Sequence, residues 1–190
     1  KGYVKLNILD VESVENFLQV YKPDMIISTA WETEHGLFWQ KQSNLDFEKA
    51  TIQLATKAFE LGVEYFAALG TMSEYGRNPG ACTEESKLVS TDIYSATKIR
   101  TGQDLITIGE QFQQKANWFR IFQAYGENEK QERFLPSLIS TLAKGEVFRI
   151  NSPDTVLDWV SSKIVAEAIF YSIEKGINGA VNIGTGVGTS

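Results

Sequence analysis

The sequence predicts an α/β protein built on a parallel sheet, and two observations lead to that fold class. Short apolar runs alternate along the chain with stretches in which apolar residues recur at the spacing of one helix face. Some runs end in polar residues, as at Ser28 and Thr29, and open α/β sheets bind ligands at the carboxyl ends of their strands. We therefore expect alternating strands and helices, with a binding site along one edge of the sheet.

In the first half of the chain, each expected element has a local reason. Residues 3–8 are expected to form a strand, and Asp10 then caps a helix whose apolar face consists of Val11, Val14, Leu18 and Tyr21. Residues 25–30 are an apolar run that suits a strand buried on both faces. Gly62 ends a second helix before a strand over residues 65–69. The apolar face of this second helix consists of Phe47, Ala50, Leu54, Ala58 and Leu61.

In the second half, residues 70–92 are rich in Gly, Pro, Asn, Ser and Thr, which predicts a long loop, and long loops in compact domains are usually functional. Further helices are expected over residues 94–114, 134–144 and 161–174. Further strands are expected over residues 118–122, 147–150 and 181–183. The elements become shorter after Tyr125, which predicts one domain over residues 1–125 and a second region over residues 126–190.

Composition narrows the function classes. The chain has 190 residues, 43% of them hydrophobic and 22% charged, as in ordinary globular proteins. One cysteine (Cys82) and one histidine (His35) exclude a disulfide framework, a zinc finger and a multi-histidine metal site, so no metal is expected and both are interpreted as loop residues without a role. The net charge of −6 argues against nucleic acid as a partner. The apolar runs are shorter than the roughly 20 residues of a membrane span, so we expect a cytoplasmic protein with no membrane contact.

The pair Tyr94 and Lys98 is the most informative chemical feature. Residues four apart on a helix lie one turn apart on the same face. A nearby ammonium stabilises a phenolate and lowers the pKa of a tyrosine from about 10, so the pair could move a proton on and off a hydroxyl group. Thr71, at the end of the expected strand 65–69, could hold such a substrate. Tyr171 and Lys175 share the spacing, but they follow an apolar stretch, and Tyr171 is interpreted as a packing residue.

Several motifs in a fixed order resemble the extended short-chain dehydrogenase/reductase family, the NAD-dependent epimerase/dehydratases that act on nucleotide sugars. They are Thr71 with Tyr75-Gly76, Thr83-Glu84, Tyr94 with Lys98, residues 119–126 (FRIFQAYG), Leu157-Asp158-Trp159-Val160, and residues 181–186 (VNIGTG). The resemblance implies a Rossmann-like doubly wound sheet with part of a small C-terminal substrate-binding region, in a homodimer. The glycine-rich phosphate-binding turn would precede Lys1, so the first βαβ unit is expected to be missing from this sequence.

The resemblance also implies roles for individual residues. Tyr94 would be the acid/base, Lys98 would lower its pKa and bind the nicotinamide ribose, and Thr71 would hold the reacting oxygen. The cofactor, NAD or NADP, would lie along Asn7, Ile8, Thr29, Ala30, Trp31, Tyr94, Lys98 and Phe122. The nucleotide-sugar substrate would contact Thr71, Gln123 and Arg133.

Some positions depart from the family pattern. Leu157 stands where the family has arginine, Asn7 where it usually has aspartate, and its helix asparagine has only the shifted candidate Asn44. The 4,6-dehydratases follow the catalytic threonine with Asp-Glu, whereas this chain has Met72-Ser73, which disfavours a dehydratase. The resemblance therefore predicts a C4 epimerase or a 4-keto reductase. Two alternatives remain open: a non-catalytic relative that binds a dinucleotide, and a pure interaction domain.

Overall fold

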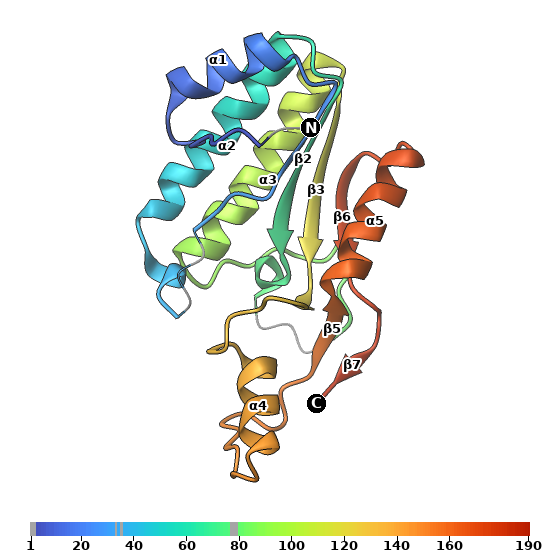
Figure 1. Cartoon of the computed structure of the whole chain (residues 1–190). Helices are drawn as coiled ribbons and strands as arrows, with labels where there is room; N and C mark the ends of the chain where they lie inside the picture. The colour runs from blue at the N-terminus through green and yellow to red at the C-terminus, as the bar shows by residue number, and fades with distance from the viewer. Residues whose placement is uncertain (1–2, 33, 35, 77–79) are drawn as a thin grey trace.

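A four-stranded parallel sheet forms the centre of the computed structural model, which describes residues 3–32, 34, 36–76 and 80–190 (Figure 1). The strand order is β1-β2-β3-β6, and every neighbouring pair is parallel. All four carboxyl ends therefore lie at the same edge of the sheet, where such sheets bind ligands. The strands are β1 (Met25–Ser28), β2 (Tyr65–Thr71), β3 (Lys115–Ile121) and β6 (Gly179–Ile183).

Helices cover both faces of this sheet, which confirms the predicted doubly wound α/β fold (Figure 1). Side chains alternate along β2, so that Phe66 and Ala68 join one buried cluster and Tyr65 and Ala67 join the other. The first cluster lies under α1 (Val11–Tyr21), α2 (Ser43–Glu60) and α3 (Ile93–Phe112). The second lies under α5 (Ser162–Glu174).

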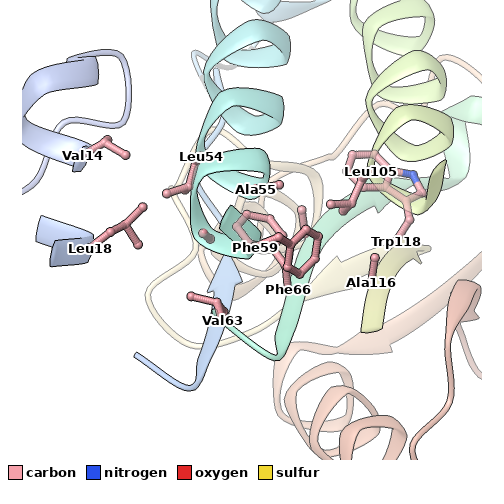
Figure 2. Packing of buried hydrophobic residues seen from close by; sticks show 12 residues of the cluster. Val14, Leu18, Leu54, Ala55, Phe59, Val63, Phe66, Leu105, Ala116 and Trp118 are labelled. Carbon is pink, nitrogen blue, oxygen red and sulfur yellow. The ribbon is translucent and has the colours of Figure 1, made fainter. Parts of the chain in front are cut away.

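The larger cluster fixes the position of α3 against the sheet. Figure 2 shows Phe59 of α2 and Phe66 of β2 packed together, with Leu105 of α3 and Trp118 of β3 beside them. Trp118 is completely buried, and a Cβ atom at Gly102 would lie 2.6 Å from its ring. A glycine at this position therefore allows α3 to approach β3 closely.

Capping residues set where the helices begin. The Asp10 carboxylate accepts a hydrogen bond from the Ser13 N–H at 3.2 Å, which confirms its predicted role at the start of α1. Asp92 and Ser95 form a reciprocal capping box at the start of α3, with the Ser95 N–H 2.7 Å from the Asp92 carboxylate. The Ser161 hydroxyl caps α5 by accepting a hydrogen bond from the Ile164 N–H at 3.2 Å. The box at Asp92 fixes the helix turn that carries Tyr94.

A smaller sheet follows the carboxyl edge of the main one. It has the order β4-β5-β7, where β4 (Gln123–Tyr125) is parallel to β5 (Leu157–Ser161) and β5 is antiparallel to β7 (Gly188–Thr189). Figure 1 shows this sheet and α4 (Phe134–Ala143) beyond the carboxyl ends of β2 and β3. Two short 3-10 helices, η1 (Phe38–Gln40) and η2 (Met72–Tyr75), complete the described elements.

Some predicted elements differ from the structure. Residues 3–8 form no strand; instead Leu6 and Ile8 pack against the first cluster. The described strands of this sheet pair only in the order β1-β2-β3-β6, so the segment has no hydrogen-bonded strand beside it. Residues 147–150 also form no strand, and Val147 is 87% exposed. The β1 strand is covered on both faces but incompletely, because it lies at the sheet edge: Ile26 packs against the first cluster and Ile27 against the second, while Met25 is exposed.

Three observations concern the wider organisation. The β6 strand lies within residues 126–190 but joins the main sheet, and the division at residue 125 stays a prediction. Among the helices of the described residues, none is long and apolar enough to cross a bilayer. The described part of the chain holds no group of three or more His, Cys, Asp and Glu side chains arranged to bind a metal, and His35 lies outside the described residues.

Candidate active site

The side chains of Thr71 and Tyr94 meet at the carboxyl edge of the sheet. Thr71 is the last residue of β2 and the N-cap of η2, and Tyr94 lies in the first turn of α3. The Thr71 side chain lies close enough to the Tyr94 hydroxyl to act on its pKa as a hydrogen-bond partner. The Thr71 hydroxyl accepts a hydrogen bond from the Ser73 N–H at 3.2 Å, which orients its oxygen. Two residues that sequence analysis selected separately therefore lie side by side.

Lys98 lies beside this pair and is almost completely buried. Its Nζ donates a hydrogen bond to the Leu69 carbonyl oxygen at 2.7 Å and lies 3.6 Å from the centre of the Trp31 ring. Burial disfavours the ammonium form and lowers the pKa of Lys98 to about 7, while the Glu74 carboxylate opposes this shift. Since the ring of Trp31 covers the amine, the cation–π contact also favours its charged form.

The acidity of Tyr94 differs from the sequence expectation. Burial raises the pKa of Tyr94 to about 12, and the charges of Glu74 and Asp92 act in the same direction. The hydrogen bond to Thr71 and the charge of Arg133 oppose this shift. The expected lowering by Lys98 is not met in this structure, because Lys98, with a pKa of about 7, loses its charge well below the pH at which Tyr94 titrates. Tyr94 is therefore protonated at neutral pH.

Aromatic residues that sequence analysis did not select border Tyr94. Phe38 and Trp39, both in η1, contact the Tyr94 ring edge-on, with ring centres 4.7 and 5.5 Å away. Asn44 anchors this segment from the start of α2, because its amide nitrogen donates to the Phe38 and Lys41 carbonyl oxygens and its oxygen accepts from Trp31 Nε1. The aromatic content of residues 31–42 was the only sequence signal for these ring contacts with Tyr94.

A buried ion pair that sequence analysis also missed lies behind Thr71. The Glu74 side chain is fully buried and accepts a hydrogen bond from Arg120 Nε at 2.8 Å. Trp118 Nε1 and the Thr71 N–H donate to the same carboxylate. The sequence signal was an acidic residue three positions after the candidate Thr71, with an arginine on a core strand.

The remaining predicted cofactor residues are distributed unequally. Thr29, Ala30 and Trp31 directly follow β1, and Phe122 directly follows β3, so these four lie at the carboxyl edge near Lys98. The Phe122 N–H donates to the Ile183 carbonyl oxygen at 3.0 Å. The structure does not bring Asn7 and Ile8 into this group. Asn7 accepts a hydrogen bond from the Leu9 N–H, and Ile8 lines a groove of about 240 Å³ beside α1 and α2. The role of both in cofactor binding stays a prediction.

The predicted substrate residues Gln123 and Arg133 lie on the side of the smaller sheet. Gln123 begins β4 and pairs with Trp159 of β5. Arg133 is the N-cap of α4, and its charge acts on Tyr94 although its Nε is bonded to Glu129 at 2.6 Å. The charge of Arg133 therefore reaches Tyr94, whereas no interaction joins Gln123 to Tyr94 in the described residues.

The glycine-rich segment 184–188 is held by a carboxylate. Asp158 accepts hydrogen bonds from the Thr185 and Gly186 N–H groups, both at 2.8 Å. A Cβ atom at Gly184 would lie 2.4 Å from the same carboxylate, so only glycine fits there. Because the N–H groups already bind a negative charge, this loop is unsuited to phosphate.

Comparisons with known proteins agree with this geometry. The model of the NAD dependent epimerase/dehydratase family matches residues 2–184. A UDP-glucose 4-epimerase from Thermotoga maritima, crystallised with UDP-glucose, superposes with a TM-score of 0.86 at 22% identity, covering 98% of this chain and 63% of that chain. A search of curated proteins found no match.

Two further solved structures have the same fold. A dTDP-glucose 4,6-dehydratase from Bacillus anthracis in complex with NAD gives a TM-score of 0.79 at 20% identity, covering 98% of this chain and 59% of that one. A UDP-N-acetylglucosamine 4-epimerase from Methanobrevibacter ruminantium, in complex with UDP-N-acetylmuramic acid, superposes with a TM-score of 0.82 at 19% identity. The match covers 98% of this chain and 62% of that chain. The chain thus spans about three fifths of the length of these proteins. The match over residues 2–184 shows that this chain belongs to the NAD-dependent epimerase/dehydratase family.

Proposed function

We propose that this chain carries the reaction centre of an NAD-dependent enzyme that acts at C4 of a nucleotide-linked sugar, as an epimerase or a 4-keto reductase. The observation that carries the proposal is the meeting of Thr71, Tyr94 and Lys98 at the carboxyl edge of the sheet. Open α/β sheets bind their ligands at this edge. A hydroxyl, a phenol and an amine together can hold a sugar oxygen and exchange a proton with it.

The residues around Lys98 fit a dinucleotide. Thr29, Ala30 and Trp31 continue from β1 and Phe122 from β3 at the carboxyl edge, and Trp31 covers the Lys98 amine. These residues would hold the cofactor, with the Lys98 amine directed to its ribose hydroxyls. Bound NAD would supply the chemistry of hydride uptake and return. Since the relatives crystallised with a dinucleotide contain NAD, we propose NAD rather than NADP.

The protonation states suit proton donation to a keto oxygen. Tyr94 is protonated at neutral pH, because its pKa is raised to about 12. In the proposed reaction, Tyr94 Oη donates its proton to the oxygen at C4 while the Thr71 hydroxyl holds that oxygen in place. A charged Lys98 stabilises the resulting phenolate until Tyr94 is protonated again.

The surroundings of Thr71 favour these reactions over a dehydratase. Elimination of water needs an acid next to the substrate, and Met72 and Ser73 supply none. The next residue, Glu74, is fully buried, and Arg120 and Trp118 hold its carboxylate. This carboxylate is therefore unsuited to donate a proton to a sugar.

We also propose that Gln123 and Arg133 bind the nucleotide diphosphate. The planar guanidinium of Arg133 matches a pair of phosphate oxygens, and Arg133 lies near enough to act electrostatically on Tyr94. In the homodimer that the family resemblance implies, α2 and α3 would pair between two copies. Leu45, Leu61 and Phe112, at the ends of these helices, are exposed and could contribute to such an interface.

A non-catalytic dinucleotide-binding relative is the second candidate. One observation favours it: the Trp31 ring covers the Lys98 amine at 3.6 Å. Product analysis separates the candidates. The full-length protein is incubated with a panel of UDP- and dTDP-hexoses, once with NAD alone and once with reduced cofactor and 4-keto sugars. A C4 epimer supports an epimerase, consumption of reduced cofactor supports a reductase, and binding of NAD without any product supports the second candidate.

A further inference from the structure

The Glu74 carboxylate at the carboxyl end of β2 is completely buried and fully occupied. Its Oε1 accepts hydrogen bonds from the Thr71 N–H and Trp118 Nε1, both at 2.9 Å. Its Oε2 accepts from Arg120 Nε at 2.8 Å and from Trp118 Nε1 at 3.1 Å. A buried charge is tolerated only when it is paired and hydrogen-bonded in this way. Replacing such a pair by apolar residues is often neutral for stability, so its presence here calls for another reason.

The contact with Thr71 connects this carboxylate to the proposed reaction centre. Glu74 and Thr71 form a reciprocal capping box around η2, in which the Thr71 hydroxyl accepts from the Ser73 N–H and Glu74 accepts from the Thr71 N–H. The box holds both the backbone and the hydroxyl of Thr71. The Thr71 side chain in turn lowers the pKa of Tyr94 as a hydrogen-bond partner would.

The contact with Arg120 anchors the arrangement to three further segments. Arg120 Nη1 donates to Tyr75 Oη at 3.0 Å and to the Glu84 carbonyl oxygen at 3.3 Å. Tyr75 Oη donates in turn to the Asn182 side-chain oxygen on β6 at 2.6 Å. The titratable groups that act with Glu74 are thus Arg120 on β3, Tyr75 beside it, Glu84 in the following loop, and Tyr94 and Lys98 on α3.

From these contacts we infer that Glu74 is a positioning residue of the reaction centre: anchored by Arg120, it holds the Thr71 N–H and so fixes the Thr71 hydroxyl against Tyr94. The inference rests on the proposed function. A positioned hydroxyl matters because small displacements of a reacting group can cost about 10²-fold in rate. The negative charge of Glu74 has a second consequence, since it raises the pKa of both Lys98 and Tyr94.

The first test separates positioning from stability. In the full-length protein, the double substitution Glu74→Met with Arg120→Met removes both buried charges and approximately keeps their volume. We expect a lower melting temperature, because the Thr71 N–H and Trp118 Nε1 lose their acceptor, and in the folded variant a kcat lowered at least tenfold with an unchanged Kd for NAD. A wild-type kcat in the folded variant would overturn the inference. Should this variant not fold, Glu74→Asp is used instead, because the shorter side chain keeps the charge but withdraws it from Thr71. A kcat lowered at least tenfold in Glu74→Asp then supports the inference, and a wild-type kcat overturns it.

The second test needs no turnover. Lysine labelled with ¹³C at Cε reports the titration of Lys98 by NMR in the cofactor-free protein. Glu74→Gln should lower the Lys98 midpoint, because the neutral amide no longer stabilises the ammonium. Glu48→Gln is the matched control, because Glu48 forms an ion pair with Arg100 in a more exposed setting. Equal midpoints in wild type and Glu74→Gln would contradict the electrostatic part. If the wild-type protein converts no nucleotide sugar, the proposed function is contradicted. The titration still tests whether the Glu74 charge acts on Lys98, because it needs no turnover.

Discussion

The Nζ atom of Lys98 lies 3.6 Å from the centre of the Trp31 ring. Trp31 is held in this position by Asn44, whose side-chain oxygen accepts from the indole N–H at 2.8 Å. The opposite restraint on Lys98 comes from the Leu69 carbonyl oxygen at 2.7 Å. The amine is thus clamped between a strand end and an aromatic ring, out of reach of bulk water. Burial away from water lowers its pKa to about 7 and outweighs the ring contact and the Glu74 charge, which both favour the ammonium form.

The buried amine should make stability depend on pH. Because the folded-state pKa is about 7 and the ordinary value is 10.5, the unfolded chain binds more protons between these limits. The cost of burying a charge is therefore full below about pH 7 and is relieved as the pH rises toward 10.5. In the wild type, Lys98 should make the free energy of unfolding rise with pH by up to about 1.4 kcal/mol per pH unit over this range, and Lys98→Met should abolish this rise. Urea unfolding of wild type and variant at several pH values measures it. Parallel stability curves would contradict the prediction.

Asn44 should be important for stability through several buried hydrogen bonds. Asn44→Leu removes the acceptor for Trp31 Nε1 and the donor for the Phe38 and Lys41 carbonyl oxygens. Each buried polar group left unsatisfied costs about 1–3 kcal/mol, so we expect at least that loss in the free energy of unfolding. The control is Asn16→Leu on an exposed position of α1, which should change stability little. Chemical denaturation compares the two, and equal effects would refute the role given to Asn44.

Local sequence patterns predicted the parts of the site that depend on one element at a time. The helix that carries Tyr94 and Lys98, the strand that ends at Thr71 and the cap at Asp10 all follow from spacing or residue type. The unpredicted contacts join residues far apart in the chain, such as Glu74 with Trp118 and Arg120. Periodicity carries no information about such pairs.

The raised pKa of Tyr94 was missed for a related reason. The expectation used the charge of one neighbour, Lys98, whereas burial under Phe38 and Trp39 dominates in the folded chain. The strand expected over residues 3–8 has the local pattern of a strand, but strand formation depends on a neighbour. In each case the deciding interaction is tertiary.

The Thr71 hydroxyl should be required for turnover. Thr71→Val keeps the shape of the side chain but removes the hydrogen bond to Tyr94, and we expect kcat to fall about 10²-fold. The loss of the cap to Ser73 should also cost about 1 kcal/mol of stability. Thr71→Ser retains the hydroxyl and should keep most of the activity. Steady-state kinetics on both variants tests the assignment, which fails if valine is tolerated as well as serine.

The close approach of α3 to β3 should make Gly102 sensitive to substitution. A Cβ atom there would lie 2.6 Å from two atoms of the buried Trp118 ring, which Glu74 holds in place. Gly102→Ala should therefore lower the free energy of unfolding by about 1–3 kcal/mol, although alanine is the better helix former. Gln103→Ala, on the exposed side of the same helix, is the control and should not destabilise. A stabilised Gly102→Ala variant would show that the ring can move aside.

The central claim is that Tyr94 is the acid/base of the reaction centre, and a matched pair of variants tests it directly. Tyr94→Phe removes only the phenolic oxygen, while Tyr171→Phe removes that of the exposed tyrosine with the same spacing to a lysine. The measurement is kcat of both full-length variants on the nucleotide sugar that the wild type converts, together with the Kd for NAD. We expect Tyr94→Phe to lose about 10²–10⁴-fold in kcat with nearly unchanged NAD binding, and Tyr171→Phe to match the wild type. Full turnover by Tyr94→Phe would contradict the account.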